Sequence, residues 1–215
     1  MDRTKMAFVM ALALALLGFG HRALANDAPL NSQMADPRMA ERAIGNPKAP
    51  VRMDEYFSLD CPHCARFDAD VLPEIKKTYI DTGKVYLVFH DFPLHEMALR
   101  AHMIARCAPA ERYLPIVETL FKVQQGWNLQ TPEASMDALK QQARFAGMTE
   151  DQIKACVNDR TLEDALLKGQ LDATKAYGLN ATPSFIFNQK ADDKLVAEGP
   201  FDKFKEKIDS LLGSK

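Results

Sequence analysis

The sequence has little net charge and no visible repetition. Its 27 Lys and Arg residues nearly balance its 29 Asp and Glu residues, which leaves a formal net charge of −2. Proteins that bind nucleic acids usually carry a basic surface, so this balance predicts no nucleic-acid partner. No internal repeat and no low-complexity tract is visible among the 215 residues, and 47% are hydrophobic. We therefore expect one large globular domain, or a domain with an insertion.

A run long enough to span a membrane is also missing. The longest apolar run, residues 6–20, is shorter than the roughly 20 residues that a spanning helix needs. It follows Arg3 and Lys5 and precedes Ala23 and Ala25, which is the layout of a secretory signal peptide. No cysteine lies near this point, so a lipid anchor is not expected. We expect cleavage after Ala25 and export of the mature protein.

The sequence is poor in cysteine, and all four cysteines follow the expected cleavage point: Cys61, Cys64, Cys107 and Cys156. Disulfides form and persist in an oxidising compartment, and the even number fits two pairs. Cys61 and Cys64 enclose Pro62 and His63 in a C-P-H-C motif, whereas the other two cysteines stand alone in the sequence.

The residue pattern predicts strands and helices in a definite order. A strand–helix–strand succession surrounds the C-P-H-C motif, and this is typical of a parallel βαβ unit. A long helical stretch, cut by Pro and Gly into four or five helices, separates that unit from a hairpin and a final helix with one apolar face. The expected segments are strand 51–59, helix 62–80, strand 84–92, helical 95–177, strands 182–189 and 194–199, and helix 201–212. Residues 26–49 are expected to be a leader.

The C-P-H-C motif lies where the first strand passes into a helix. Unpaired N–H groups and the positive end of the helix dipole favour a thiolate at Cys61. Pro62 is tolerated at a helix start, and His63 can add a hydrogen bond or a positive charge. Such settings lower the pKa of a cysteine, and a stabilised thiolate makes the corresponding disulfide a strong oxidant.

Other interpretations of the motif are weaker. A zinc site would need two further ligands, and a structural staple or a coincidental pair would not explain the position within a βαβ unit. The stretch "HEMAL" lacks the second histidine of a zinc-protease helix, so we expect His95 and His102 on a helix surface. Neither a metal nor another cofactor is expected.

The stretches "EYFSLDCPHC", "YIDTGKVYLVFHDFPL" and "ATPSFIF", with the helical block between them, resemble the DsbA family of exported thiol oxidases over about residues 41–213. The resemblance implies an α/β chain with a thioredoxin-like fold and an inserted all-helical domain. Residues 50–94 and 178–215 would form the thioredoxin-like domain and residues 95–177 the insertion. It also implies a periplasmic location.

The resemblance assigns roles to individual residues. Cys61 would be the exposed nucleophile, Cys64 its buried partner and His63 the residue that tunes the pair. Thr182 and Pro183 match a loop whose proline is cis and packs against the disulfide.

A further acid, Glu55, would be buried behind the cysteines and relay a proton to Cys64; the alternative is a strand-edge carboxylate in water. Cys107 and Cys156 resemble an extra disulfide found in an α-proteobacterial branch of the family. We therefore expect them to form a structural disulfide; the alternative is two free buried thiols.

The family implies a monomer that donates its disulfide to newly exported proteins with free thiols and is reoxidised by a DsbB-type, quinone-linked membrane protein. A threonine precedes Pro183 where enteric oxidases carry valine, which leaves a disulfide isomerase or reductase as the alternative. A non-redox metal-binding protein or holdase is a weaker one.

Overall fold

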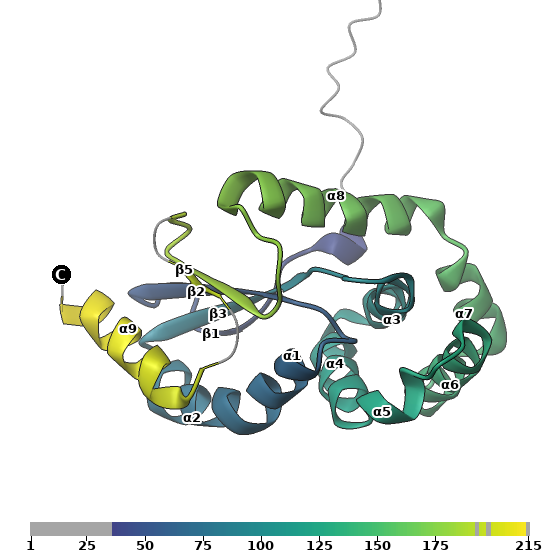
Figure 1. The fold of residues 1–215 in the computed structure, drawn as a ribbon, viewed down its shortest axis with the longest axis horizontal. Coiled ribbons are helices and arrows are strands. Elements are labelled where there is room, and N and C mark those ends of the chain that lie inside the picture. The colour runs from purple at the N-terminus through teal and green to yellow at the C-terminus, as the bar shows by residue number, and fades with distance from the viewer. Residues whose placement is uncertain (1–35, 192–193, 197–198, 214–215) are drawn as a thin grey trace, which may run out of the picture. The chain divides into compact units, whose positions relative to one another are not determined.

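A five-stranded mixed sheet forms the centre of the thioredoxin-like part (Figure 1). This computed structural model describes residues 36–191, 194–196 and 199–213, so the expected signal peptide and the first part of the leader lie outside the described residues. The strand order is β1-β3-β2-β4-β5. The strands are β1 (Arg42–Gly45), β2 (Val51–Phe57), β3 (Val85–Asp91), β4 (Ser184–Phe187) and β5 (Lys194–Val196).

The two central strands are parallel, and every other pair is antiparallel. β2 pairs with β3 from Val51 opposite Val85 to Phe57 opposite Asp91. Six of the seven β2 residues are buried, as is typical of a central strand covered on both faces. The predicted strand–helix–strand unit is therefore present, and the thioredoxin-like fold class is confirmed.

Strand β1 differs from the expectation, because it falls within residues 26–49, which the sequence pattern assigns to a leader. This four-residue edge strand pairs antiparallel with β3. Its residues are half-buried or exposed and show no alternation, so its conformation depends on pairing with β3. Gly45 ends it with φ +100°, and a Cβ there would lie 2.6 Å from the Val85 carbonyl oxygen. Only glycine fits that position.

A continuous helical stretch follows the C-P-H-C motif, as predicted for residues 62–80. It consists of α1 (Pro62–Arg66), a π-helical turn η2 (Phe67–Val71), α2 (Leu72–Ile75) and a second π-helical turn η3 (Lys76–Ile80). Pro73 has no N–H and cannot continue the α-helical hydrogen bonding. The Leu72 N–H bonds to Phe67 O, five residues back, so the wider turn accommodates the proline.

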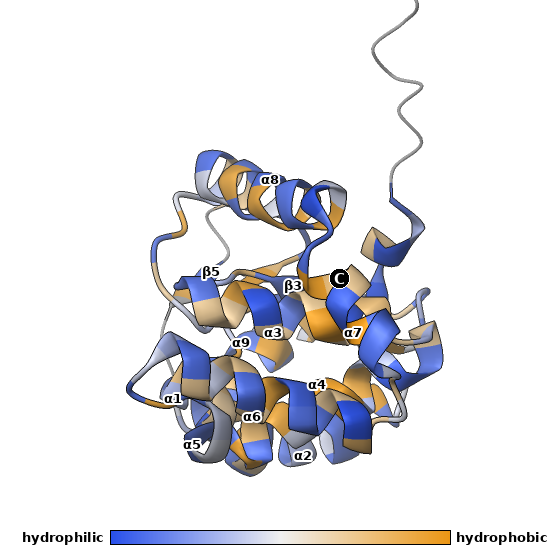
Figure 2. Cartoon of the chain, turned by 90° about the vertical axis from the view of Figure 1, so that its right-hand side faces the viewer, coloured by the Kyte–Doolittle hydropathy of each residue, from blue (hydrophilic) through white to orange (hydrophobic). Residues whose placement is uncertain are grey.

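The insertion contains six α-helices where four or five are expected. They are α3 (Glu96–Cys107), α4 (Tyr113–Lys122), α5 (Gln124–Trp127), α6 (Pro132–Phe145), α7 (Glu150–Val157) and α8 (Arg160–Tyr177). The additional helix is the single turn α5, directly after α4. Figure 2 shows mainly polar residues on the outward side of α4 and α6, while Ala98, Ala101 and Met103 of α3 are fully buried.

The helices cover both faces of the sheet (Figure 1). Phe185 and Phe187 of β4 pack into the large core with Phe204 of α9 (Phe201–Gly213). Ile186 points to the opposite face, where it packs with Ala173 of α8. This alternation follows from the two-residue period of a strand. In the part of the chain that the structure describes, no helix is long and apolar enough to cross a membrane.

Candidate active site

Cys61 and Cys64 lie where β2 leads into α1, and both are free thiols in this structure. Cys61 is the N-cap residue of α1, and Cys64 lies one turn further on. Both cysteines are buried: Cys64 is fully buried, and Cys61 is 5% exposed. The expectation that Cys61 is exposed is therefore wrong for the dithiol form. The Cys61 sulfur lies 3.3 Å from the carbonyl oxygen of Thr182, and this loop contributes to its burial.

The two thiols differ strongly in acidity. The pKa of Cys61 is lowered from 9.0 to about 5, chiefly because the Cys64 thiol donates a hydrogen bond to its sulfur. Burial opposes this shift, while the Thr182 hydroxyl and the N–H groups of Cys64 and His63 support it. The pKa of Cys64 is raised well above its ordinary value, first by burial and then by the hydrogen bond and charge of Cys61. The site therefore favours a thiolate at Cys61 and a thiol at Cys64.

His63 and Pro62 are exposed between the two cysteines. The His63 N–H is one of the donors that lower the pKa of Cys61. The ring Nδ1 lies 2.7 Å from Arg66 Nη2. Because a guanidinium only donates, Nδ1 accepts this hydrogen bond.

The peptide bond between Thr182 and Pro183 is cis, and Thr182 is 7% exposed. Among the described residues, the Thr182 hydroxyl has no hydrogen-bond partner, and the Cys61 thiol donates to the Thr182 carbonyl oxygen instead. The side chain of Thr182 is one of the groups that lower the pKa of Cys61, because an ionised sulfur can accept its hydrogen bond. An unpartnered buried hydroxyl costs about 1–3 kcal/mol, so its position favours the thiolate form.

Glu55 lies on β2 and is 3% exposed, which contradicts the alternative of a carboxylate in water. Burial raises its pKa well above 4.5, and the charge of Asp68 adds to the shift. The pKa of Asp68 is itself raised to about 6 by burial and then by Glu118. Asp68 of η2 and Glu118 of α4 line the same groove of about 1040 Å³. Glu55 in turn contributes to the raised pKa of Cys64.

His102 is fully buried, and the expectation that it lies on a helix surface is wrong. Its Nε2 accepts a hydrogen bond from the Leu59 N–H at 3.2 Å, and its Nδ1 lies 2.6 Å from Asp91 Oδ1. These partners assign the ring proton to Nδ1. Ala98 and Ala105, four residues before and three residues after His102 on the same helix face, are the apolar signal that could have placed it inside. His95, by contrast, has a 76% exposed side chain.

Asp91 links His102 to a buried polar network that the sequence did not predict. Arg106 Nε donates to Asp91 Oδ2 at 2.6 Å, and Tyr113 OH donates to Oδ1 at 2.8 Å. Burial alone would raise the pKa of Asp91, but Arg106 and His102 outweigh it, and the pKa is lowered. The network therefore contains an ionised aspartate directly behind the loop that carries Cys61.

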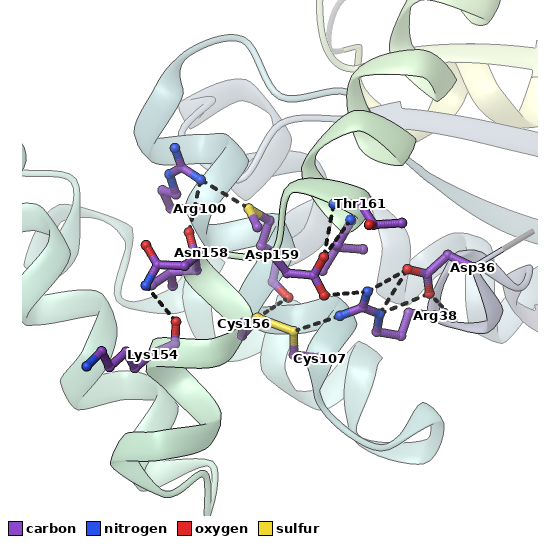
Figure 3. Close-up of a disulfide and its surroundings, with 12 residues drawn as sticks. Asp36, Arg38, Arg100, Cys107, Lys154, Cys156, Asn158, Asp159 and Thr161 are labelled. Carbon is purple, nitrogen blue, oxygen red and sulfur yellow. Dashed lines mark hydrogen bonds and ion pairs between the residues drawn. A yellow bond between two sulfur atoms is a disulfide. The ribbon is translucent and has the colours of Figure 1, made fainter.

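A disulfide joins Cys107 at the end of α3 to Cys156 in α7 (Figure 3), with a Cα–Cα distance of 6.1 Å. Arg38 lies against this bond, with Nη1 3.7 Å from Cys107 Sγ, and its Nη2 is 2.8 Å from Asp159 Oδ2. The N-terminal segment is thereby connected to the start of α8. The disulfide therefore joins α3 to α7 beside the ion pair between Arg38 and Asp159.

A sheet with this strand order and a C-x-x-C pair at the first helix start defines the class of thioredoxin-like proteins. A family profile described as Thioredoxin matches residues 38–209. The crystal structure of Wolbachia pipientis alpha-DsbA1 is 30% identical, with a TM-score of 0.74, and the match covers 81% of this chain and 92% of that one. The chain therefore belongs to the thioredoxin family, as a member of its DsbA type.

Two curated relatives agree with this assignment. Disulfide bond formation protein D of Bacillus subtilis is 26% identical over 180 residues, which cover 80% of this chain and 77% of the relative. A protein of Rickettsia bellii, whose name assigns it provisionally to the protein-disulfide oxidoreductases, is 30% identical over 149 residues, or 69% of this chain. The match spans only 57% of that relative, so this chain matches little more than half of its length.

Proposed function

We propose that this protein is a thiol:disulfide oxidoreductase that donates a Cys61–Cys64 disulfide to exported proteins. The observation that carries the proposal is the opposite shift of the two cysteine pKa values, down to about 5 for Cys61 and well upward for Cys64. A stabilised Cys61 thiolate favours the reduced form of the pair, so the oxidised form readily gives up its disulfide.

The reaction starts when a substrate thiolate attacks the Cys61 sulfur of the disulfide. The Cys61–Cys64 bond breaks, Cys64 leaves as a thiolate, and a mixed disulfide forms between Cys61 and the substrate. A second substrate thiolate then attacks the substrate sulfur and releases Cys61 as a stable thiolate. The substrate loses two electrons and the enzyme gains them. Protons leave the substrate thiols, and one proton goes to Cys64.

Glu55 can supply the proton that the departing Cys64 needs. Its raised pKa keeps the carboxyl protonated at a higher pH than an ordinary glutamate, and its electrostatic effect on Cys64 supports a role in this transfer. Asp68 and the groove that it lines offer a route by which Glu55 regains a proton from solvent.

The reduced enzyme needs an oxidant that accepts two electrons. A DsbB-type, quinone-linked membrane protein that faces the periplasm is the partner that the DsbA-type family supports. Residues 1–25 have the layout of an export signal, which would bring this chain to the periplasm. We propose that the protein acts there as a monomer. Its substrates are newly exported proteins with free thiols, in a compartment where disulfides persist.

The test is disulfide formation in a reduced, unfolded substrate protein. Oxidised enzyme should form substrate disulfides in stoichiometric amounts, and Cys64→Ser should accumulate a mixed disulfide at Cys61. Cys61→Ser should do neither, while Cys107→Ala/Cys156→Ala should still form substrate disulfides. An oxidised wild-type enzyme that transfers no disulfide would refute the proposal.

An isomerase or reductase is the second candidate, and Thr182 is the residue that favours it. Its side chain is one of the groups that lower the pKa of Cys61 and so stabilise the reduced form, and an isomerase works from its reduced form. If the reduced enzyme refolds a scrambled substrate faster than the oxidised enzyme oxidises a reduced one, isomerisation is the main activity.

A further inference from the structure

The loop from Ser58 to Cys61, between β2 and α1, is held by side chains from the helical insertion. His102 of α3 accepts the Leu59 N–H at 3.2 Å. Gln124 of α5 approaches the same loop, and its Nε2 donates to Leu59 O at 2.7 Å and to Cys61 O at 3.0 Å. Both peptide groups of Leu59 are therefore bonded to the insertion rather than to the sheet.

Gln124 differs from the residues beside it. It is only 9% exposed, whereas Gln125 and Gly126 are exposed. An amide nitrogen carries two hydrogens, so a single Nε2 can serve both carbonyls at once. Burying this amide without partners would cost free energy, and the two hydrogen bonds to the loop offset that cost. The position thus requires a neutral side chain with two donors.

The two carbonyls concern the chemistry because each carries a partial negative charge within the short loop that bears Cys61. The Cys61 carbonyl also accepts the Ala65 N–H at 3.2 Å, so it keeps a partner without Gln124. For the Leu59 carbonyl, Gln124 is the donor that the structure shows. Holding both oxygens toward α5 leaves the N–H groups of His63 and Cys64 directed at the sulfur, where they stabilise a negative charge.

We propose that Gln124 is a positioning residue for Cys61: from the insertion, it fixes the two carbonyls of the catalytic loop so that the thiolate is stabilised. This inference rests on the proposed function, in which Cys61 is the redox nucleophile. It makes the insertion part of the redox machinery, because α5 belongs to that domain.

The test compares Gln124→Met, which keeps the volume but has no donor, with Gln125→Met one residue further on. The absorbance of the thiolate is followed against pH, and the redox equilibrium with glutathione is measured at pH 7. In Gln124→Met the midpoint of the thiolate titration should rise by about one pH unit, and the equilibrium should move about tenfold toward the oxidised enzyme. A tenfold change corresponds to about 30 mV for this two-electron couple. Gln125→Met should leave both values unchanged.

Gln124→Glu provides a second variant of nearly the same shape, with Gln125→Glu as its control for the added charge. The carboxylate that Gln124→Glu introduces would, once ionised, face two carbonyls and raise the midpoint further, while Gln125→Glu should not. Thermal unfolding of both redox forms separates positioning from a purely structural role. A structural role lowers the unfolding temperature of both forms equally and leaves the potential at the wild-type value.

Wild-type midpoints and potentials in folded Gln124→Met and Gln124→Glu would overturn the inference, as would an equal loss of stability in both redox forms. Failure of the proposed function has a different signature. In that case the wild-type enzyme itself would show a thiolate midpoint near the ordinary cysteine value and transfer no disulfide.

Discussion

The pH dependence of the redox potential gives a direct measure of the unequal cysteine pair. With the pKa of Cys61 at about 5 and that of Cys64 well above 9.0, reduction takes up two protons below pH 5 and one proton between pH 5 and 8. Each proton per two electrons changes the potential by about 30 mV per pH unit. A plot of potential against pH should therefore bend near pH 5, from a slope of about 60 mV to about 30 mV per unit.

The same shift makes the stability of the reduced protein depend on pH. The folded pKa of Cys61 is depressed, so its thiolate stabilises the fold fully above the unfolded pKa near 9, and this stabilisation is lost as pH falls through about 5. At pH 7 the two pH units between 7 and 5 correspond to about 3 kcal/mol. Cys64 adds nothing in this window, because it stays protonated in both folded and unfolded chains.

The oxidised protein serves as the internal control, since its Cys61 has no ionisable thiol. Urea unfolding of both redox forms at pH 4 and pH 7 should show the reduced form gaining about 3 kcal/mol relative to the oxidised form. Glutathione equilibria across pH 4–8 give the slope. A constant slope of about 60 mV per unit, with an unchanged stability difference, would refute the reasoning because Cys61 would then be an ordinary thiol.

Three other substitutions have defined outcomes. Thr182→Val removes a hydroxyl that lowers the pKa of Cys61, and should raise the thiolate midpoint by about one pH unit, since a hydrogen bond to a charged group contributes about 1.5–3 kcal/mol; Thr182→Ser should not. Glu55→Gln should raise the free energy of unfolding at pH 8 but not at pH 4, because a raised carboxyl pKa disfavours folding once the unfolded chain ionises; it should also slow disulfide transfer in stopped-flow measurements. Cys107→Ala/Cys156→Ala opens a loop with a sequence separation of 49 and should lower the free energy of unfolding by about 4 kcal/mol in urea titrations; an unchanged midpoint would contradict this.

Local signals in the sequence were enough to predict the centre of the fold. β2, the following helix and β3 each combine a clear apolar pattern with a defined end, and the C-P-H-C motif lies at the one strand-to-helix transition where a cysteine pair gains reactivity. Strand β1 was not predictable in this way. Its four residues bury no continuous face, and its extended conformation is fixed by backbone pairing with β3, which no local pattern encodes.

The polar residues behind the catalytic loop were missed for a related reason. Glutamine usually lies at the surface and histidine is intermediate in burial, and here His102 and Gln124 are each buried with a partner distant in sequence. The partner is the backbone of Leu59 in both cases. From the sequence alone, a polar residue in a helical pattern is expected to be exposed. Its burial could be predicted only if its hydrogen-bond partner, a backbone group distant in sequence, were known.

The backbone groups of that loop need hydrogen-bond partners, and this need also explains why the insertion packs against the loop. Beyond the end of β2 the chain leaves the sheet, and its buried N–H and C=O groups need partners that no neighbouring strand supplies. His102 and Gln124 bind Leu59 from two different helices, and Asp91 holds His102 in the tautomer that can accept the Leu59 N–H. The helical insertion thus supports the loop through Leu59, while the Cys61 thiol donates a hydrogen bond to the carbonyl oxygen of Thr182. A change that displaces α5 or reorients His102 should therefore alter the chemistry of Cys61 without touching either sulfur.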